Sequence, residues 1–178
     1  GGSPCATNDS TGYNRGQITE LMECADFQNY CFDPDCDIKA SNPIFREICD
    51  ADVRIVADGG IKNSGYASKA FGAGADAIIM GGYFARANEA ETNLYGDGTY
   101  WGGASEKQQI LATGSANRHS EGKEFKIEDP ILSLEKLVSD LWGGISSAVS
   151  YSGYKSLTDF IYNGYFEVKE NSLPPRRN

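Results

Sequence analysis

The clearest hydrophobic pattern lies in residues 53–82, where two short apolar runs flank a segment of helical character. The first run, residues 53–57, stops at an aspartate and a glycine pair, and the second, residues 77–80, stops at another glycine pair. Between them, small and apolar residues recur at helical spacing behind a cap at Asn63 or Ser64. Two buried strands joined by a helix form a βαβ unit, so we expect the two strands to lie parallel.

Residues able to bind a ligand fall just beyond both predicted strands. Asp58, Gly59 and Gly60 follow the first strand, and Gly81 and Gly82 follow the second. The carboxyl ends of parallel strands are where α/β folds keep their ligand sites. Glycine pairs leave backbone N–H groups accessible to an anion, and a carboxylate can accept from a sugar diol. The pattern predicts a nucleotide monophosphate site, although a glycine pair by itself also fits a tight turn.

A loop of small residues at the start of the chain carries a candidate nucleophile. It reads GGSPCAT, with Cys5 at its tip and Ser3 able to donate to a phosphate. A thiol becomes reactive where neighbouring N–H groups or positive charge lower its pKa. The alternative interpretation is that Cys5 is an inert small hydrophobic residue.

The rest of the pattern predicts further elements around this core. Residues 17–27 are typical of an amphipathic helix. Its inward face is expected to contain Ile18, Leu21, Met22 and Ala25. Residues 83–90 predict a short helix, and residues 95–100 contain strong turn residues and predict a hairpin turn.

Residues 29–50 read as an insertion before the first strand. Four cysteines, Cys24, Cys31, Cys36 and Cys49, fall in or beside it. Their gaps lack a tight C-x₂-C knuckle, so we expect buried thiols around a turn rather than a zinc site.

Composition narrows the functional classes. The formal net charge of -9 argues against a nucleic-acid partner, which needs a basic surface. No apolar run approaches the length of a transmembrane helix, and no signal peptide is visible, so no membrane partner is expected. Five cysteines without a leader favour free thiols in a reducing compartment, and hence a cytoplasmic protein.

Several short motifs occur in one order along the chain. They are GSPCAT at residues 2–7, TG at 11–12, QIT at 17–19, ADGG at 57–60, GAGAD at 72–76 and MGG at 80–82. Their order and spacing resemble the C-terminal half of the IMP dehydrogenase/GMP reductase family. The resemblance implies an α/β fold that is the C-terminal portion of a TIM (β/α)8 barrel, incomplete because the first strands are missing. Residues 1–166 then form this half-barrel with the insertion at 29–50, and residues 167–178 form a tail.

The resemblance also implies roles for individual residues. In this family a loop cysteine attacks C2 of the purine to give a covalent thioimidate, which makes Cys5 the nucleophile, with Thr7 and Glu121 as a proton relay. The implied substrate-binding residues are Ser3, Asp58, Gly59, Gly60, Gly81, Gly82, Gly102, Gly103, Ala104, Arg118, Ser120 and Gly122. The implied cofactor-binding residues are Gly103, Asn117, Arg118, Ser147 and Ser150. A monovalent cation, potassium, would bind at Gly2 and Cys5.

Two segments separate the activities within the family. Residues 118–123, read here as the flap segment, have the sequence RHSEGK and resemble the RASEGK run of GMP reductases. IMP dehydrogenases usually carry an Arg-Tyr pair in a longer flap, and no such pair occurs here. Residues 60–65 look closer to the corresponding segment of IMP dehydrogenases. Of the two segments, we give more weight to the flap, which favours NADPH-dependent reductive deamination of GMP to IMP and ammonia. The alternatives are IMP dehydrogenase, which converts IMP to XMP with NAD, and a non-catalytic nucleotide-binding half-barrel.

The same resemblance predicts partners. Much of the nicotinamide-cofactor site belongs to the family's N-terminal strands, which this chain lacks. We therefore expect little or no activity from the chain alone. It should need the N-terminal half of the enzyme, in cis or as a separate chain, and form a homo-oligomer, commonly a tetramer in this family.

Overall fold

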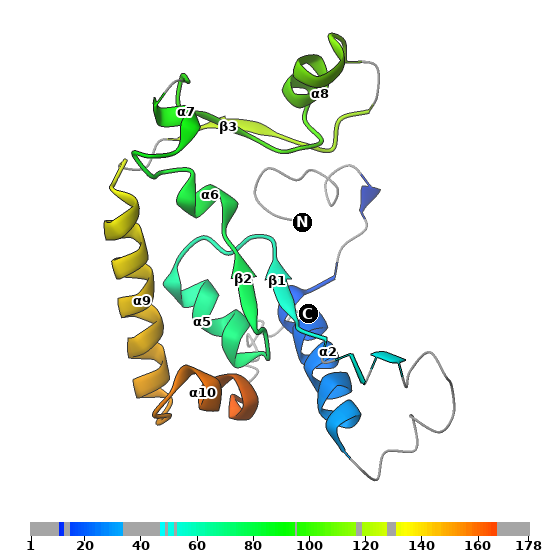
Figure 1. The fold of residues 1–178 in the computed structure, drawn as a ribbon, viewed down its shortest axis with the longest axis vertical. Coiled ribbons are helices and arrows are strands. Elements are labelled where there is room, and N and C mark those ends of the chain that lie inside the picture. The colour runs from blue at the N-terminus through cyan, green and yellow to red at the C-terminus, as the bar shows by residue number, and fades with distance from the viewer. Residues whose placement is uncertain are drawn as a thin grey trace, which may run out of the picture.

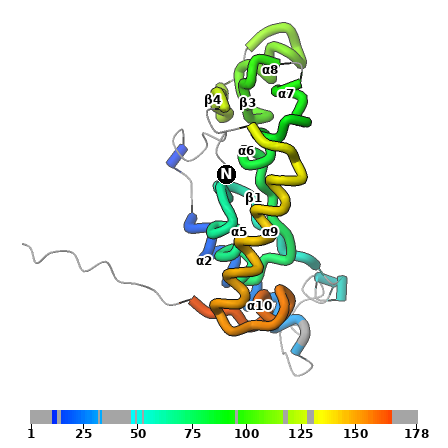
Figure 2. Tube along the Cα trace, turned by 90° about the vertical axis from the view of Figure 1, so that its left-hand side faces the viewer, coloured from blue at the N-terminus to red at the C-terminus, as the bar shows by residue number. Residues whose placement is uncertain are grey.

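The computed structural model describes residues 11–12, 15–33, 47–48, 50–51, 53–94, 96–116, 119–127 and 131–166. Figure 1 shows an α/β unit with a two-stranded ribbon and a short helix at one end. In the side view the ribbon again lies at one end of the molecule and α10 (Leu157–Asn163) at the other (Figure 2).

The predicted βαβ unit is confirmed. β1 (Val56–Asp58) pairs in parallel with β2 (Ala77–Ile79), and α5 (Ser64–Gly72) connects them. Asn63 caps α5 because its side chain accepts a hydrogen bond from the Tyr66 N–H. The first strand begins later than the apolar run suggested and includes Asp58, which therefore lies at the carboxyl end of β1.

Small residues allow three helices to pack closely on one face of the sheet. Ala67 and Ala70 of α5 are fully buried, and α9 (Leu134–Tyr151) and α10 pack against α5. Figure 1 shows α9 running alongside α5 toward α10. A Cβ added to Gly144 of α9 would lie 2.4 Å from the Ser64 Cβ, so only glycine permits this helix contact.

The opposite face of the sheet is uncovered among the described residues. Ala57 belongs to the hydrophobic core and is 2% exposed, whereas Val56 and Ile79 are each 51% exposed. The two described strands pair only with each other in this sheet, so each leaves an outer edge. Parallel sheets are normally buried on both faces, and this surface is therefore suited to contact with further protein.

The ribbon consists of β3 (Thr99–Trp101) and β4 (Glu124–Lys126), which pair antiparallel. The hairpin turn predicted at residues 95–100 is wrong, because the partner strand comes only after α8 (Glu106–Thr113). The described turn residues instead stabilise the start of β3. Asp97 accepts from the Thr99 N–H at 3.0 Å, and its hydrogen bonds with Thr99 lower the pKa of this carboxyl.

Helix boundaries also differ from the predictions. α2 covers Gln17–Phe32 and so extends into the expected insertion. On α2, Leu21 is buried as predicted, but Met22 is 42% exposed. The helix predicted at residues 83–90 is replaced by α6 (Gly81–Phe84) and α7 (Glu91–Leu94), which lie on either side of a short connection.

The cysteine expectations are met only in part. Cys24 is a free thiol but is exposed, so the prediction of a buried thiol is wrong for it. Cys31 is disulfide-bonded, so the prediction of free thiols is wrong for Cys31. Cys36, Cys49 and the predicted tail at residues 167–178 lie outside the described residues. Across the residues that the structure describes, no helix has the length and apolarity needed to cross a membrane, and no group of side chains could hold a metal ion.

Adjacent glycines of α9 test the helix contact. Gly144→Ala should lower the free energy of unfolding by about 1–3 kcal/mol, because the new methyl group overlaps Ser64. Gly143→Ala has open space around it and should instead stabilise the helix by about 0.5–1 kcal/mol. Urea unfolding monitored by far-UV circular dichroism measures both. Equal unfolding midpoints for the two variants would contradict the predicted contact.

Candidate functional site

The tips of the two parallel strands lie at one end of the α/β unit. Gly59 and Gly60 follow Asp58 with φ angles of 113° and 69°, a region that favours glycine. No atom lies within 4 Å of the position that a Cβ of Gly60 would take, so this turn is open on that side. The Gln17 amide, at the start of α2, donates to the carbonyl oxygens of Asp58 and Gly59 at 3.0 and 2.9 Å. Gln17 therefore holds this turn in place, a function that its own sequence motif did not reveal.

Tyr100 of the ribbon lies against the second strand tip. A Cβ added to Gly81 would be 2.2 Å from the Tyr100 hydroxyl oxygen, so the tyrosine occupies the space that a side chain would fill. Burial and the negative charge of Asp58 both raise the pKa of Tyr100. The hydroxyl therefore stays protonated near neutral pH and can donate a hydrogen bond. Sequence reasoning missed this residue, because only long-range packing places it beside Gly81.

Phe125 of β4 extends the cover over the second glycine pair. Its ring atom Cζ is 4.0 Å from the Cβ position of Gly82, and its ring meets that of Tyr100 edge-on at a centroid distance of 5.4 Å. The ribbon thus contributes two aromatic side chains to the surroundings of Gly81 and Gly82.

A cavity of about 770 Å³ opens beside Gly81 and Tyr100. Trp101 and Lys107 also line it, and the Lys107 ammonium lies 4.2 Å from the centroid of the Trp101 ring. The lining also contains two carboxylates, Glu91 and Asp97, so its aromatic walls suit a flat ring but its charge does not favour an anion. Of the candidate phosphate-binding glycines, Gly81 lines this cavity.

Two segments predicted to contact the purine come together in the structure. The backbone N–H of Gly102 donates to the Lys123 carbonyl at 3.1 Å, and that of Gly122 donates to the Ala104 carbonyl at 3.2 Å. The pairing places the half-buried Glu121 next to residues 102–104. A candidate acid–base residue and a candidate base-binding loop therefore share one location.

A family model described as "IMP dehydrogenase / GMP reductase domain" matches residues 1–172. The chain belongs to this family. It is 32% identical to an inosine-5'-monophosphate dehydrogenase of Chlorobaculum tepidum, over 93% of this chain and 33% of the relative. It is 31% identical to a GMP reductase of Onchocerca volvulus, over 93% of this chain and 42% of the relative. The chain thus spans less than half the length of these curated relatives.

A solved structure supports the same relationship. The chain is similar to a GMP reductase C318A of Trypanosoma brucei in complex with guanosine 5'-monophosphate. The TM-score is 0.68 at 27% identity, covering 90% of this chain and 30% of the other. The mixed α/β fold is therefore the fold of this family, and residues from every described part of the site fall within the matched region.

Some residues that the family resemblance named are not brought together with this site. Ser147 and Ser150 are exposed in the last turns of α9, and the Ser147 hydroxyl donates to the Gly143 carbonyl at 3.0 Å. This part of α9 lies beside α10, at the end of the unit remote from α6 and Gly81 (Figures 1 and 2). The remaining predicted site residues lie outside the described residues: Gly2, Ser3, Cys5, Thr7, Asn117 and Arg118.

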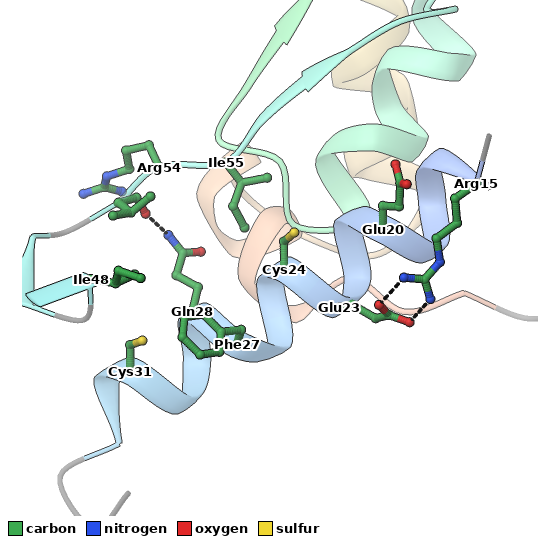
Figure 3. Close-up of a pocket in the computed structure, with 11 residues that line it drawn as sticks. Arg15, Glu20, Glu23, Cys24, Phe27, Gln28, Cys31, Ile48, Arg54 and Ile55 are labelled. Carbon is green, nitrogen blue, oxygen red and sulfur yellow. Dashed lines mark hydrogen bonds and ion pairs between the residues drawn. The ribbon is translucent and has the colours of Figure 1, made fainter. Parts of the chain in front are cut away.

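A second cavity, of about 630 Å³, lies between α2 and the chain that leads into β1. Figure 3 shows Cys24 and Phe27 of α2 facing Ile55, with an ion pair between Arg15 and Glu23 at the side. This cavity is at the amino end of β1, whereas Asp58 and the glycines are at the carboxyl end. It is therefore separate from the candidate nucleotide site.

The contact between Tyr100 and Gly81 can be tested by a double-mutant cycle. Gly81→Ala should lower the free energy of unfolding by about 1–3 kcal/mol, because its methyl group meets the tyrosine hydroxyl. In a Tyr100→Phe background the hydroxyl is absent. Gly81→Ala should then lower the free energy of unfolding by less than about half as much as it does in the wild type. Urea unfolding of the four proteins gives the coupling energy. A cost that is identical in both backgrounds would contradict the contact.

Proposed function

We propose that this chain is the substrate-binding C-terminal half of a GMP reductase. The observation that supports it best is the pairing of the flap segment with residues 102–104, beside the covered glycines at the strand tips. The flap carries the SEGK sequence that resembles GMP reductases. The similarity to a GMP reductase in complex with guanosine 5'-monophosphate points in the same direction.

The substrate is held from three sides in this proposal. The phosphate of GMP binds to the backbone N–H groups of Gly60, Gly81 and Gly82, with the Tyr100 hydroxyl as a further donor. The ribose hydroxyls donate to the carboxylate of Asp58. The purine then lies toward residues 102–104 and the flap, and Ser3 adds a hydroxyl to the phosphate.

The chemistry begins at C2 of the purine. The Cys5 thiolate adds to this carbon, and the bond from C2 to the exocyclic nitrogen breaks as ammonia leaves, with its proton supplied through Thr7 and Glu121. The product is a thioimidate on Cys5. After C2 has been reduced, the C–S bond breaks, which returns the thiolate and releases IMP. Covalent attachment divides one difficult substitution into two easier steps.

NADPH is the reductant that the GMP reductase assignment implies, and it would supply a hydride to C2. The described residues do not assemble a site for it, because Gly103 lies between β3 and α8, whereas Ser147 and Ser150 belong to the last turns of α9, which runs toward α10 (Figure 1). We therefore assign the cofactor site mainly to protein beyond this chain and derive no step through it. The potassium site at Gly2 and Cys5, the homo-oligomer and the cytoplasmic location stay predictions.

IMP dehydrogenase is the second candidate. Identity does not separate the two activities, since the chain is 32% identical to an IMP dehydrogenase and 31% identical to a GMP reductase. Residues 60–65 also resemble the dehydrogenase version. The flap favours the reductase, because it has the shorter SEGK form without an Arg-Tyr pair.

The assay that decides the function uses the chain joined to, or co-expressed with, the N-terminal half of the enzyme. We expect this reconstituted protein to convert GMP with NADPH, and the chain alone to show little or no turnover. Cys5→Ser should reduce turnover by about 10³-fold or more, because the hydroxyl is a far weaker nucleophile. Turnover of IMP with NAD alone would overturn the reductase assignment. Turnover unaffected by Cys5→Ser would favour a different mechanism.

The uncovered face of the sheet is the proposed contact surface for the N-terminal half. Val56 and Ile79 present apolar surface there, and relatives are more than twice as long as the matched region. Val56→Asp would bury a charge at this contact and should weaken association by about tenfold or more. Tyr151→Asp, at a side chain that is 90% exposed on α9, is the matched control and should leave association unchanged. Co-purification of the two halves measures both. Full association of the Val56→Asp chain would place the partner elsewhere.

A further inference from the structure

The flap is docked on a specific turn of the chain. We call residues 102–105 the purine turn, because they contain the candidate base-binding positions. The Gly102 and Gly122 N–H groups each donate across the contact, at 3.1 and 3.2 Å, and Ser105 and Gly122 form a parallel bridge.

Gly122 fits this contact only because it lacks a side chain. A Cβ at this position would lie 2.3 Å from the Ser105 backbone nitrogen and 2.7 Å from the Ala104 carbonyl carbon. Both neighbours are backbone atoms, so neither can swing aside as the end of a flexible side chain could. An alanine here would have to push the two segments apart.

The purine turn is itself held firmly. Ser105 is fully buried, its N–H donates to the Gly102 carbonyl at 2.9 Å, and its hydroxyl caps α8 by accepting from the Gln108 N–H at 3.2 Å. The turn is thus continuous with a helix start and cannot easily move to relieve a clash. An alanine at Gly122 would therefore displace the flap rather than the purine turn.

Ser120 uses its hydroxyl within the protein. The oxygen lies 3.0 Å from the Ala104 carbonyl and 3.1 Å from the Gly122 carbonyl, so the hydroxyl proton is shared between these two acceptors. It therefore joins the flap to the purine turn from the side chain, as Gly122 does from the backbone. Glu121 lies between these two attachment points.

We propose that Ser120 and Gly122 are positioning residues that hold Glu121 at the purine turn. Their role is then to orient the candidate proton-relay carboxylate. The part played by Glu121 rests on the proposed function, whereas the docking of the flap does not.

Hydrogen–deuterium exchange tests the docking without any catalytic assay. In the wild-type chain, free of nucleotide, the backbone amides of Gly102 and Gly122, which donate the two cross-segment hydrogen bonds, should exchange slowly. Gly122→Ala should speed their exchange by about tenfold or more, because the two cross-segment hydrogen bonds are lost. Gly143→Ala, a glycine on α9 with open space around it, is the control and should leave this exchange unchanged. Far-UV circular dichroism checks that the total helix content is retained in both variants. Slow exchange in Gly122→Ala would overturn the proposal.

Kinetics of the reconstituted protein separate positioning from substrate contact. Ser120→Ala should lower kcat by about tenfold while KM for GMP changes less than about twofold, because the ground-state contacts to GMP are intact. Ser120→Thr keeps the hydroxyl and should restore kcat. A raised KM at unchanged kcat would overturn the positioning role. Slow flap exchange in a wild-type protein that turns over no GMP would support the docking and count against the proposed reaction instead.

Discussion

The contact between the Tyr100 hydroxyl and Gly81 joins the two parts of the candidate site. On one side lie the parallel strands, whose tips carry Asp58 and the glycines, and on the other lies the ribbon, which carries the purine turn and the flap. If Gly81 had a side chain, the ribbon could not approach, and the flap would lie away from the strand tips. The absence of a side chain at Gly81, a candidate phosphate-binding position, therefore leaves space for the ribbon that covers it. The missing Cβ of Gly81 thus matters both for access to the backbone N–H groups and for the packing of the ribbon. The second effect depends on the tertiary structure.

The parts of the fold that could be predicted are those determined by local sequence. The βαβ unit follows from two apolar runs, a capping residue at Asn63 and glycines at the ends, and all of these act over short distances. The ribbon could not be predicted in the same way. The turn residues near Asp97 suggested a local hairpin, but β3 pairs with a strand that comes after α8, and no local preference encodes that pairing.

The same distinction applies to the candidate site. Asp58 and the glycine pairs could be inferred because strand ends in parallel sheets are recurrent ligand positions. Tyr100 could not, because its contribution depends on packing across the ribbon and on a charge on a distant strand. The alternation of apolar and polar residues also placed Met22 on the inward face of α2, where the structure exposes it. Helical spacing identifies a face only when the neighbouring elements cover that face.

The Gln17 amide has a consequence for how motion would spread through the molecule. It donates to two consecutive carbonyl groups, those of Asp58 and Gly59, and so attaches the first turn of α2 to the end of β1. In the sequence, α2 follows the small-residue loop that carries Cys5. Any displacement of this first helical turn would therefore pull on the backbone of Asp58, a candidate acceptor for a sugar. The start of α2 and the end of β1 are thus expected to move together.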